Sequence, residues 1–118
     1  MFKVLAFLTK REGIETQAFI DYYENKHVPL ICRLAGAPIV YKRRYVLHGE
    51  RVTTEGGVVD FDVITELGFA DRDAFLAWMT KLSGPGAGEL VAADEARFLD
   101  RSRTRAYVVE EYVTAGEL

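Results

Sequence analysis

Two ionisable side chains lie where the sequence pattern predicts the apolar surface of a helix. Residues 19–34 place aromatic or aliphatic side chains every three or four positions, and His27 falls on that stripe. Asp94 has Leu90 four positions before it and Phe98 four positions after it. Partly buried acids and bases cost free energy unless they are paired, and such sites often have shifted pKa values. A histidine in this setting could act as a general base or acid near neutral pH.

Both residues also allow a purely structural interpretation. Pro29 lacks a backbone N–H, so we expect the first helix to end or kink near His27 and a second short helix to follow. His27 could then donate a hydrogen bond to a backbone carbonyl at the bend. Asp94 could pair with an arginine such as Arg97 or Arg101. The sequence leaves the structural and the catalytic interpretations open.

The elements that must position these residues can be predicted from the hydrophobic periodicity. Strands are expected at residues 2–9, 39–47, 61–69 and 104–113. Helices are expected from residue 16 to the bend near residue 27, then on to residue 36, and at residues 72–82 and 88–99. This order predicts a ferredoxin-like α+β fold, in which an antiparallel sheet carries its helices on one face.

The first and third predicted strands carry apolar side chains on both of their faces. Helices of one chain would cover only one face of the sheet. A second copy of the chain would cover the other face, so the pattern predicts a homodimer formed by sheet-on-sheet packing.

Composition limits the class of protein. The 118 residues suit a single domain, 1–118, and 49% hydrophobic with 28% charged residues is typical of a soluble globular chain. The net charge of -3 argues against nucleic acid or anionic membrane as a partner, and no apolar run is long enough to span a bilayer. No signal peptide is recognisable, so we expect a cytoplasmic protein. Cys32 has no second thiol to pair with, and neither metal nor nucleotide motifs are present, so no cofactor is expected.

Four short motifs in order resemble the EthD domain family. They are His27-Val28-Pro29-Leu30, Tyr41 on the second strand, the strand FDVITELGF at residues 61–69, and ADEARFLD at residues 93–100. The resemblance extends from about residue 2 to residue 113. It implies a dimeric α+β barrel of ferredoxin-like protomers. It also implies similarity to small cofactor-independent enzymes, such as polyketide dehydratases and cyclases, lactone isomerases and quinone-forming oxygenases.

Carried over residue by residue, the resemblance implies three catalytic candidates, His27, Asp94 and Tyr41. His27 would remove a proton next to a substrate carbonyl. Asp94 would orient the imidazole or protonate a leaving hydroxyl, and Tyr41 would donate a hydrogen bond to the developing oxyanion. Elimination of water from an aromatic or polyketide-like small molecule fits these roles.

Further side chains are predicted to bind a hydrophobic or aromatic substrate: Tyr23, Tyr45, Glu66, Phe69, Trp78 and Phe98. Tyr22 is a further aromatic residue that could line the site. Most of these aromatic residues are expected to be core or dimer contacts instead. Strand alternation places Glu66 on the face opposite Thr65 and Leu67, so it points either into a helix–sheet pocket or into the dimer interface. An ion pair with Arg44 is the structural alternative for Glu66.

The preferred function is therefore a cofactor-independent lyase or isomerase of the dehydratase or cyclase type. Two alternatives stay open. One is a cofactor-free monooxygenase of an anthrone or phenol, which would also need a base but would consume oxygen. The other is a non-catalytic accessory protein that binds a small hydrophobic ligand.

Overall fold

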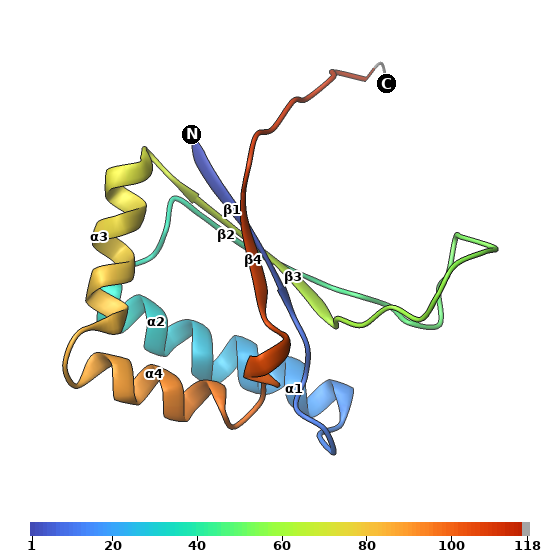
Figure 1. The fold of residues 1–118 in the computed structure, drawn as a ribbon, viewed down its shortest axis with the longest axis horizontal. Helices are drawn as coiled ribbons and strands as arrows, with labels where there is room; N and C mark the ends of the chain where they lie inside the picture. Colours follow the sequence, from blue (N-terminus) through green and yellow to red (C-terminus); the bar gives the residue numbers. More distant parts are fainter. Residues whose placement is uncertain (117–118) are drawn as a thin grey trace.

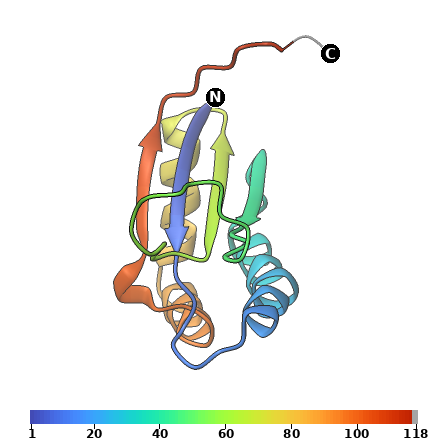
Figure 2. The same ribbon diagram turned by 90° about the vertical axis from the view of Figure 1, so that its right-hand side faces the viewer.

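One antiparallel sheet of four strands forms a layer with all helices on one side (Figures 1 and 2). The computed structural model describes residues 1–116. The strand order is β2-β3-β1-β4, with bounds β1 Phe2–Leu8, β2 Val40–Tyr45, β3 Val63–Phe69 and β4 Arg105–Val109. The helical segments are α1 Thr16–Tyr22, η1 Tyr23–His27, α2 Val28–Ala35, α3 Arg72–Ser83, α4 Ala87–Glu95 and η2 Arg101–Arg103. The predicted ferredoxin-like α+β fold is confirmed.

Alternation along β1 and β3 decides which side chains face the helices. The two central strands pair antiparallel, with Val4 opposite Leu67 and Ala6 opposite Thr65. Val4 and Leu67 are buried with Phe69 in one core cluster, on the side where α3 packs. A second cluster surrounds Phe19, and the sheet and the first helices both contribute to it. Together these clusters hold the helix layer against the sheet.

The last strand ends earlier than the sequence predicts. Strand character was expected to residue 113, but β4 stops at Val109. β4 is an edge strand that pairs only with β1, and its last pair joins Val109 to Lys3 near the start of the chain. Within residues 1–116 no strand pairing is found beyond that pair, and the next residues run away from the sheet (Figure 1). The predicted helix 88–99 also ends earlier, at Glu95.

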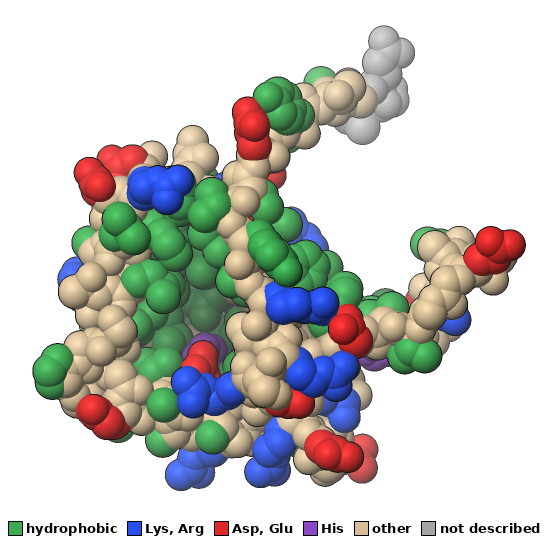
Figure 3. All heavy atoms as spheres, in the orientation of Figure 1, with side chains coloured by type: hydrophobic (Ala, Val, Ile, Leu, Met, Phe, Trp, Pro, Cys, Tyr) green, Lys and Arg blue, Asp and Glu red, His purple; other side chains and the backbone are tan. Residues whose placement is uncertain are grey.

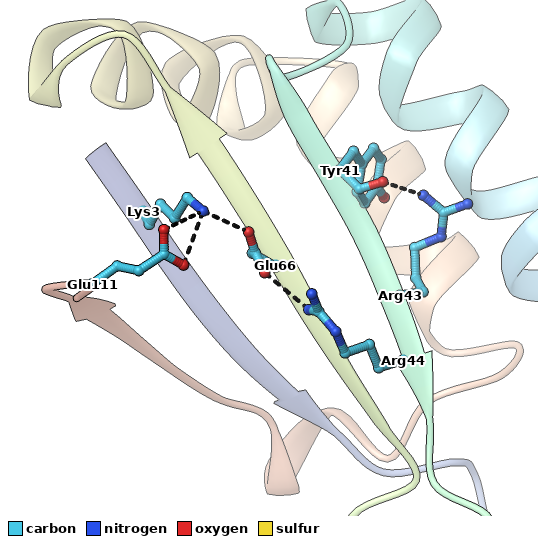
Figure 4. A network of polar contacts seen from close by, with 6 residues as sticks. All are labelled: Lys3, Tyr41, Arg43, Arg44, Glu66 and Glu111. Carbon is cyan, nitrogen blue, oxygen red and sulfur yellow. Dashed lines mark hydrogen bonds and ion pairs between the residues drawn. The ribbon is translucent and has the colours of Figure 1, made fainter. Parts of the chain in front are cut away.

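The sheet face away from the helices carries a buried carboxylate with two cationic partners (Figure 4). Glu66 Oε2 accepts a hydrogen bond from Lys3 Nζ at 2.9 Å, and Glu66 Oε1 accepts one from Arg44 Nη1 at 2.9 Å. Lys3 also donates to Glu111 at 2.8 Å. The ion pair with Arg44, which the sequence offered as the structural alternative for Glu66, is therefore present.

The ion pairs of Glu66 make the free energy of unfolding depend on pH in the acid range. The hydrogen bond from Lys3 lowers the pKa of Glu66 below its ordinary value of 4.5. The folded state therefore favours the charged carboxylate. The charged Glu66 contributes fully to the free energy of unfolding above its ordinary pKa, and this contribution is lost as the pH falls through the lowered pKa of the folded state. We expect Glu66→Gln to flatten the decline in the free energy of unfolding between pH 6 and pH 3. Urea unfolding at each pH measures it, and an unchanged slope would show that Glu66 does not contribute.

Candidate active site

A π-helical turn carries His27 into the interior. Pro29 has no N–H to donate to the carbonyl four residues earlier, and in a regular α-helix its ring would crowd that carbonyl. The chain widens instead, and the N–H of Val28 donates to the carbonyl of Tyr23, five residues back. The bend predicted near His27 therefore takes the form of η1, and the helix continues directly into α2. Turns of this kind occur frequently at functional sites.

His27 and Asp94 form a partly buried pair. The distance from His27 Nδ1 to Asp94 Oδ2 is 2.7 Å, and the two side chains are only 8% and 11% exposed. An ionised carboxylate can only accept, so the proton of this bond is assigned to Nδ1. The alternative partner Arg101 is engaged elsewhere, because its Nε donates to Glu95 at 3.2 Å. The structure thus joins two residues that lie 67 positions apart in the sequence.

Tyr22 occupies the second oxygen of the same carboxylate. Its hydroxyl donates to Asp94 Oδ1 at 2.7 Å. Burial, reinforced by this hydrogen bond, raises the pKa of Tyr22 to about 12, so the hydroxyl keeps its proton. Phe98 packs against both donors of Asp94, with ring centroids 5.1 Å from Tyr22 and 4.9 Å from His27.

A cavity of about 470 Å³ lies between the sheet and the helices, and His27 lines it. Its walls are mainly apolar and include Leu8, Ile31, Leu67, Trp78, Leu82 and Val91. In Figure 3 it is the hollow beside α3, where green side chains form the walls and purple, red and blue side chains gather at one end. A volume of this size is typical of small-molecule sites.

The second nitrogen of His27 is not fully buried. Within residues 1–116, no side-chain nitrogen or oxygen is both fully buried and without a hydrogen-bond partner. His27 Nε2 has no partner in that part of the chain, so it retains some exposure, and His27 is one of the residues that line the cavity. An imidazole whose Nδ1–H is held by a carboxylate presents a basic lone pair at Nε2.

Hydroxyl groups line the cavity as well. The Tyr23 hydroxyl lies 2.5 Å from Thr65 Oγ1, and Tyr41 lines the cavity beside them. Burial raises the pKa of Tyr23 to about 12 and raises that of Tyr41 further above the ordinary value for tyrosine. These phenols therefore stay protonated near neutral pH and are hydrogen-bond donors.

Arg43 contacts both the ring and the backbone carbonyl of Tyr41. The guanidinium of Arg43 lies 4.9 Å from the Tyr41 ring centroid, and its Nη1 donates to the Tyr41 carbonyl at 2.8 Å (Figure 4). Arg43 also binds the Glu24 carboxylate through Nε at 2.9 Å, and the Tyr45 hydroxyl donates to Glu24. The Arg43 hydrogen bonds lower the pKa of Glu24 below its ordinary value. This cluster links η1 to β2.

The predicted substrate-binding residues separate into two groups. Tyr23 and Trp78 line the cavity, as does the catalytic candidate Tyr41. Four others do not line it: Tyr45, Glu66, Phe69 and Phe98. Phe98 is fully buried against aromatic rings, and Phe69 packs on Phe75 and Trp78. The Tyr45 hydroxyl donates to Glu24. Glu66 lies on the opposite face of the sheet, where it binds Arg44.

The structure also changes the roles of other residues. Thr65, Glu95 and Arg101 line the cavity, although the sequence did not predict this. Tyr22 could have lined the site as an aromatic residue, but it binds Asp94 from outside the cavity. Thr65 had a signal, because it is a hydroxyl residue on the otherwise apolar face of β3. The bond from Tyr22 to Asp94 had no signal, because an α-helical projection places Tyr22 away from His27.

Two further findings concern residues 1–116. No group of three or more histidine, cysteine, aspartate or glutamate side chains in this range is arranged to hold a metal ion. None of the helices found there has the length and apolar character needed to cross a membrane.

Comparison with known families gives the chain its classification. The family model described as EthD domain matches residues 11–102, which is most of the chain. The chain belongs to the EthD domain family. A comparison with curated protein sequences found no match.

Solved structures show the same EthD-type fold at low sequence identity. An ethyl tert-butyl ether D (EthD) family protein from Bacillus halodurans is 20% identical with a TM-score of 0.60, and the alignment covers 95% of this chain and 100% of that one. A protein from Arabidopsis thaliana is 11% identical with a TM-score of 0.65, covering 98% and 99%. A NIPSNAP family protein from Agrobacterium tumefaciens is 14% identical with a TM-score of 0.58, covering 95% and 94%. At these identities the likeness concerns the fold alone.

Proposed function

We propose that this EthD-domain protein catalyses proton transfer on a carbonyl-containing aromatic or polyketide-like small molecule, as a cofactor-independent lyase or isomerase of the dehydratase or cyclase type. The observation that supports this most is the His27–Asp94 pair, whose Nδ1–Oδ2 distance is 2.7 Å, at the wall of an apolar cavity. It combines a base, a group that orients the base and a space for substrate.

Each polar group has a role in this proposal. Nε2 of His27 takes a proton from the carbon next to the substrate carbonyl, and the electron pair of the broken C–H bond forms an enolate. Tyr41 donates a hydrogen bond to the enolate oxygen. In a dehydratase the enolate then expels a β-hydroxyl group, which leaves as water with the proton from the imidazolium. Because both oxygens of Asp94 are occupied by donors, we assign it the orienting role rather than protonation of the leaving group.

The cavity suits an apolar body with one polar end. Its walls come from aliphatic side chains and from Trp78, whose indole is fixed by a hydrogen bond from Nε1 to the Gly36 carbonyl at 2.9 Å. Its polar groups include the His27 imidazole and three hydroxyls, from Tyr23, Tyr41 and Thr65. A carbonyl or phenol could bind there while the rings contact the apolar walls.

A probe that needs no knowledge of the natural substrate tests proton abstraction. 2-Tetralone is a bicyclic aromatic ketone with exchangeable protons next to its carbonyl. Incubated with the protein in D₂O, it should lose those proton signals in ¹H NMR faster than in buffer alone. Trp78 is the single tryptophan of the chain and lines the cavity, so its fluorescence reports binding of the same probe independently. Binding without accelerated exchange would contradict the proposal and favour an accessory ligand-binding protein.

Oxygen consumption distinguishes the oxygenase alternative from the lyase or isomerase. Anthrone has an acidic methylene group across its central ring from the carbonyl, and a base in the cavity that removes this proton would also activate the molecule toward oxygen. An oxygen electrode distinguishes proton exchange alone, which fits the lyase or isomerase, from anthrone-dependent oxygen uptake.

We also propose that two copies of the chain pack through the open faces of their sheets. Leu5, Phe7 and Ile64 share this face and are only partly exposed, and together they form an apolar surface around the Glu66 network. A surface of this kind on a sheet is typical of an interface. We expect sedimentation velocity to give the mass of a dimer and Leu5→Arg to shift the protein to monomer. A monomeric wild-type chain at micromolar concentration would refute this.

A further inference from the structure

We propose that Tyr22 is a positioning residue, whose hydroxyl acts through Asp94 to orient the His27 imidazole and set its affinity for a proton. The inference rests on the proposed role of His27 as a base. It concerns a residue that does not line the cavity and would not contact the substrate.

The first support is the geometry at the Asp94 carboxylate. Oδ2 accepts from His27 Nδ1 and Oδ1 accepts from the Tyr22 hydroxyl, both at 2.7 Å. A carboxylate held by only one donor is free to rotate about its terminal torsion, which is broad. With a donor on each oxygen its plane is fixed, and the direction of the His27 bond is fixed with it. Nε2 then keeps one orientation toward the cavity.

The second support is the π turn between the two residues. Five residues correspond to about 1.4 turns of a regular α-helix, which would place Tyr22 and His27 about 140° apart around the helix axis. The wider turn of η1, closed by the bond from the Val28 N–H to the Tyr23 carbonyl, reduces this angle. It lets both side chains reach the same carboxylate from one helix.

The third support is packing that holds the arrangement together. Phe98 packs against both the Tyr22 ring and the His27 ring, with centroid distances of 5.1 and 4.9 Å. Phe98 is fully buried, so neither ring can move without disturbing the core. Packing in the core therefore holds the Tyr22 ring in the position from which its hydroxyl donates to Asp94.

The electrostatic consequence has a definite sign. A hydroxyl that donates to Asp94 draws negative charge toward itself and weakens the attraction between the carboxylate and a protonated imidazole. Removing the hydroxyl should make His27 easier to protonate. The other charged or titratable groups around this part of the cavity are Tyr23 on η1, Tyr41 on β2, Glu95 on α4 and Arg101 on η2, and Arg97 lies near Tyr22. None of them is altered by a substitution at position 22.

Tyr22→Phe removes one oxygen and keeps the ring, which makes it the direct test. We expect the titration midpoint of His27, followed by NMR of its ring protons, to move to higher pH by about half to one pH unit. The pH profile of 2-tetralone exchange should move in the same direction, and its plateau rate should fall severalfold. Tyr45→Phe is the matched control, because it also removes a tyrosine hydroxyl that donates to a carboxylate, in this case Glu24. It should leave the titration midpoint of His27 unchanged.

A second variant makes the test specific. In an Asp94→Asn background, Tyr22→Phe should no longer move the His27 midpoint, because the carboxylate through which it acts is absent. An unchanged His27 titration in Tyr22→Phe, or an equal shift with Asp94→Asn already present, overturns the inference. If wild-type protein fails to accelerate exchange while Tyr22→Phe still moves the midpoint, the proposed function falls and the positioning contact stands.

Discussion

Replacing His27 with glutamine should lower the rate of 2-tetralone exchange by about 10²- to 10⁴-fold, the usual contribution of a general base. A glutamine amide can still donate to the Asp94 carboxylate, so the helix contact with α4 is retained. It has no lone pair of comparable basicity to present to the cavity at neutral pH. The loss should appear in the rate of exchange and not in binding, which Trp78 fluorescence measures separately.

The chain offers a matched control for this experiment. His48 is the second of its two histidines and lies near the Asp62 carboxylate, with Nε2 to Oδ1 at 2.9 Å and a side chain 43% exposed. It resembles His27 in chemistry, but it does not line the cavity. His48→Gln should therefore exchange the probe at the wild-type rate. Wild-type exchange in His27→Gln would show that another group abstracts the proton.

Truncating Phe98 to alanine should reduce the free energy of unfolding by about 3–5 kcal/mol, the range observed for large aromatic residues in cores. Its side chain is completely buried and contacts the rings of Phe19, Tyr22, Tyr23 and His27. Small domains have only about 5–15 kcal/mol in total. The loss would thus remove a large part of the stability, and the cavity left behind would loosen the Tyr22–Asp94–His27 contacts.

Urea unfolding followed by circular dichroism measures this loss. Leu90→Ala is a suitable control, because Leu90 is 53% exposed on α4 and should cost less than about 1 kcal/mol. A similarly small loss for Phe98→Ala would mean that the neighbouring rings close the space. Together the two variants distinguish a core role for Phe98 from the substrate contact that the sequence suggested.

The site was predictable from the sequence where a polar residue interrupts an apolar pattern. His27 and Asp94 each lie on an apolar stripe, and Pro29 marks the bend that carries His27. Periodicity describes one element at a time, however, and says nothing about which elements meet. The bond between α4 and η1 depends on how two helices pack on one sheet, so the pairing itself could be inferred only by resemblance.

The differences between the sequence-based expectations and the structure have physical reasons of the same kind. Alternation correctly placed Glu66 opposite Thr65, but strand sequence alone does not say which face receives the helices. Aromatic residues such as Phe69 and Phe98 carry the same signal whether they line a cavity or fill the core. The end of β4 depends on where its partner β1 begins, which is information from the other end of the chain.

The turn at η1 has a consequence for how this chain tolerates insertions and deletions. Relative to an uninterrupted α-helix of the same length along its axis, the segment holds an additional residue. Deleting one residue between Tyr22 and His27 would return the segment to a regular α-helix, in which four residues turn through about 400°. Tyr22 and His27 would then stay on about the same side of the helix, and α1 would keep its orientation relative to α2. A deletion in a regular part of α1 has no wide turn to absorb it, and it would rotate the residues before it by about 100° relative to α2. The turn that carries His27 is therefore the place where this helix should lose a residue with the least change in the alignment of the site.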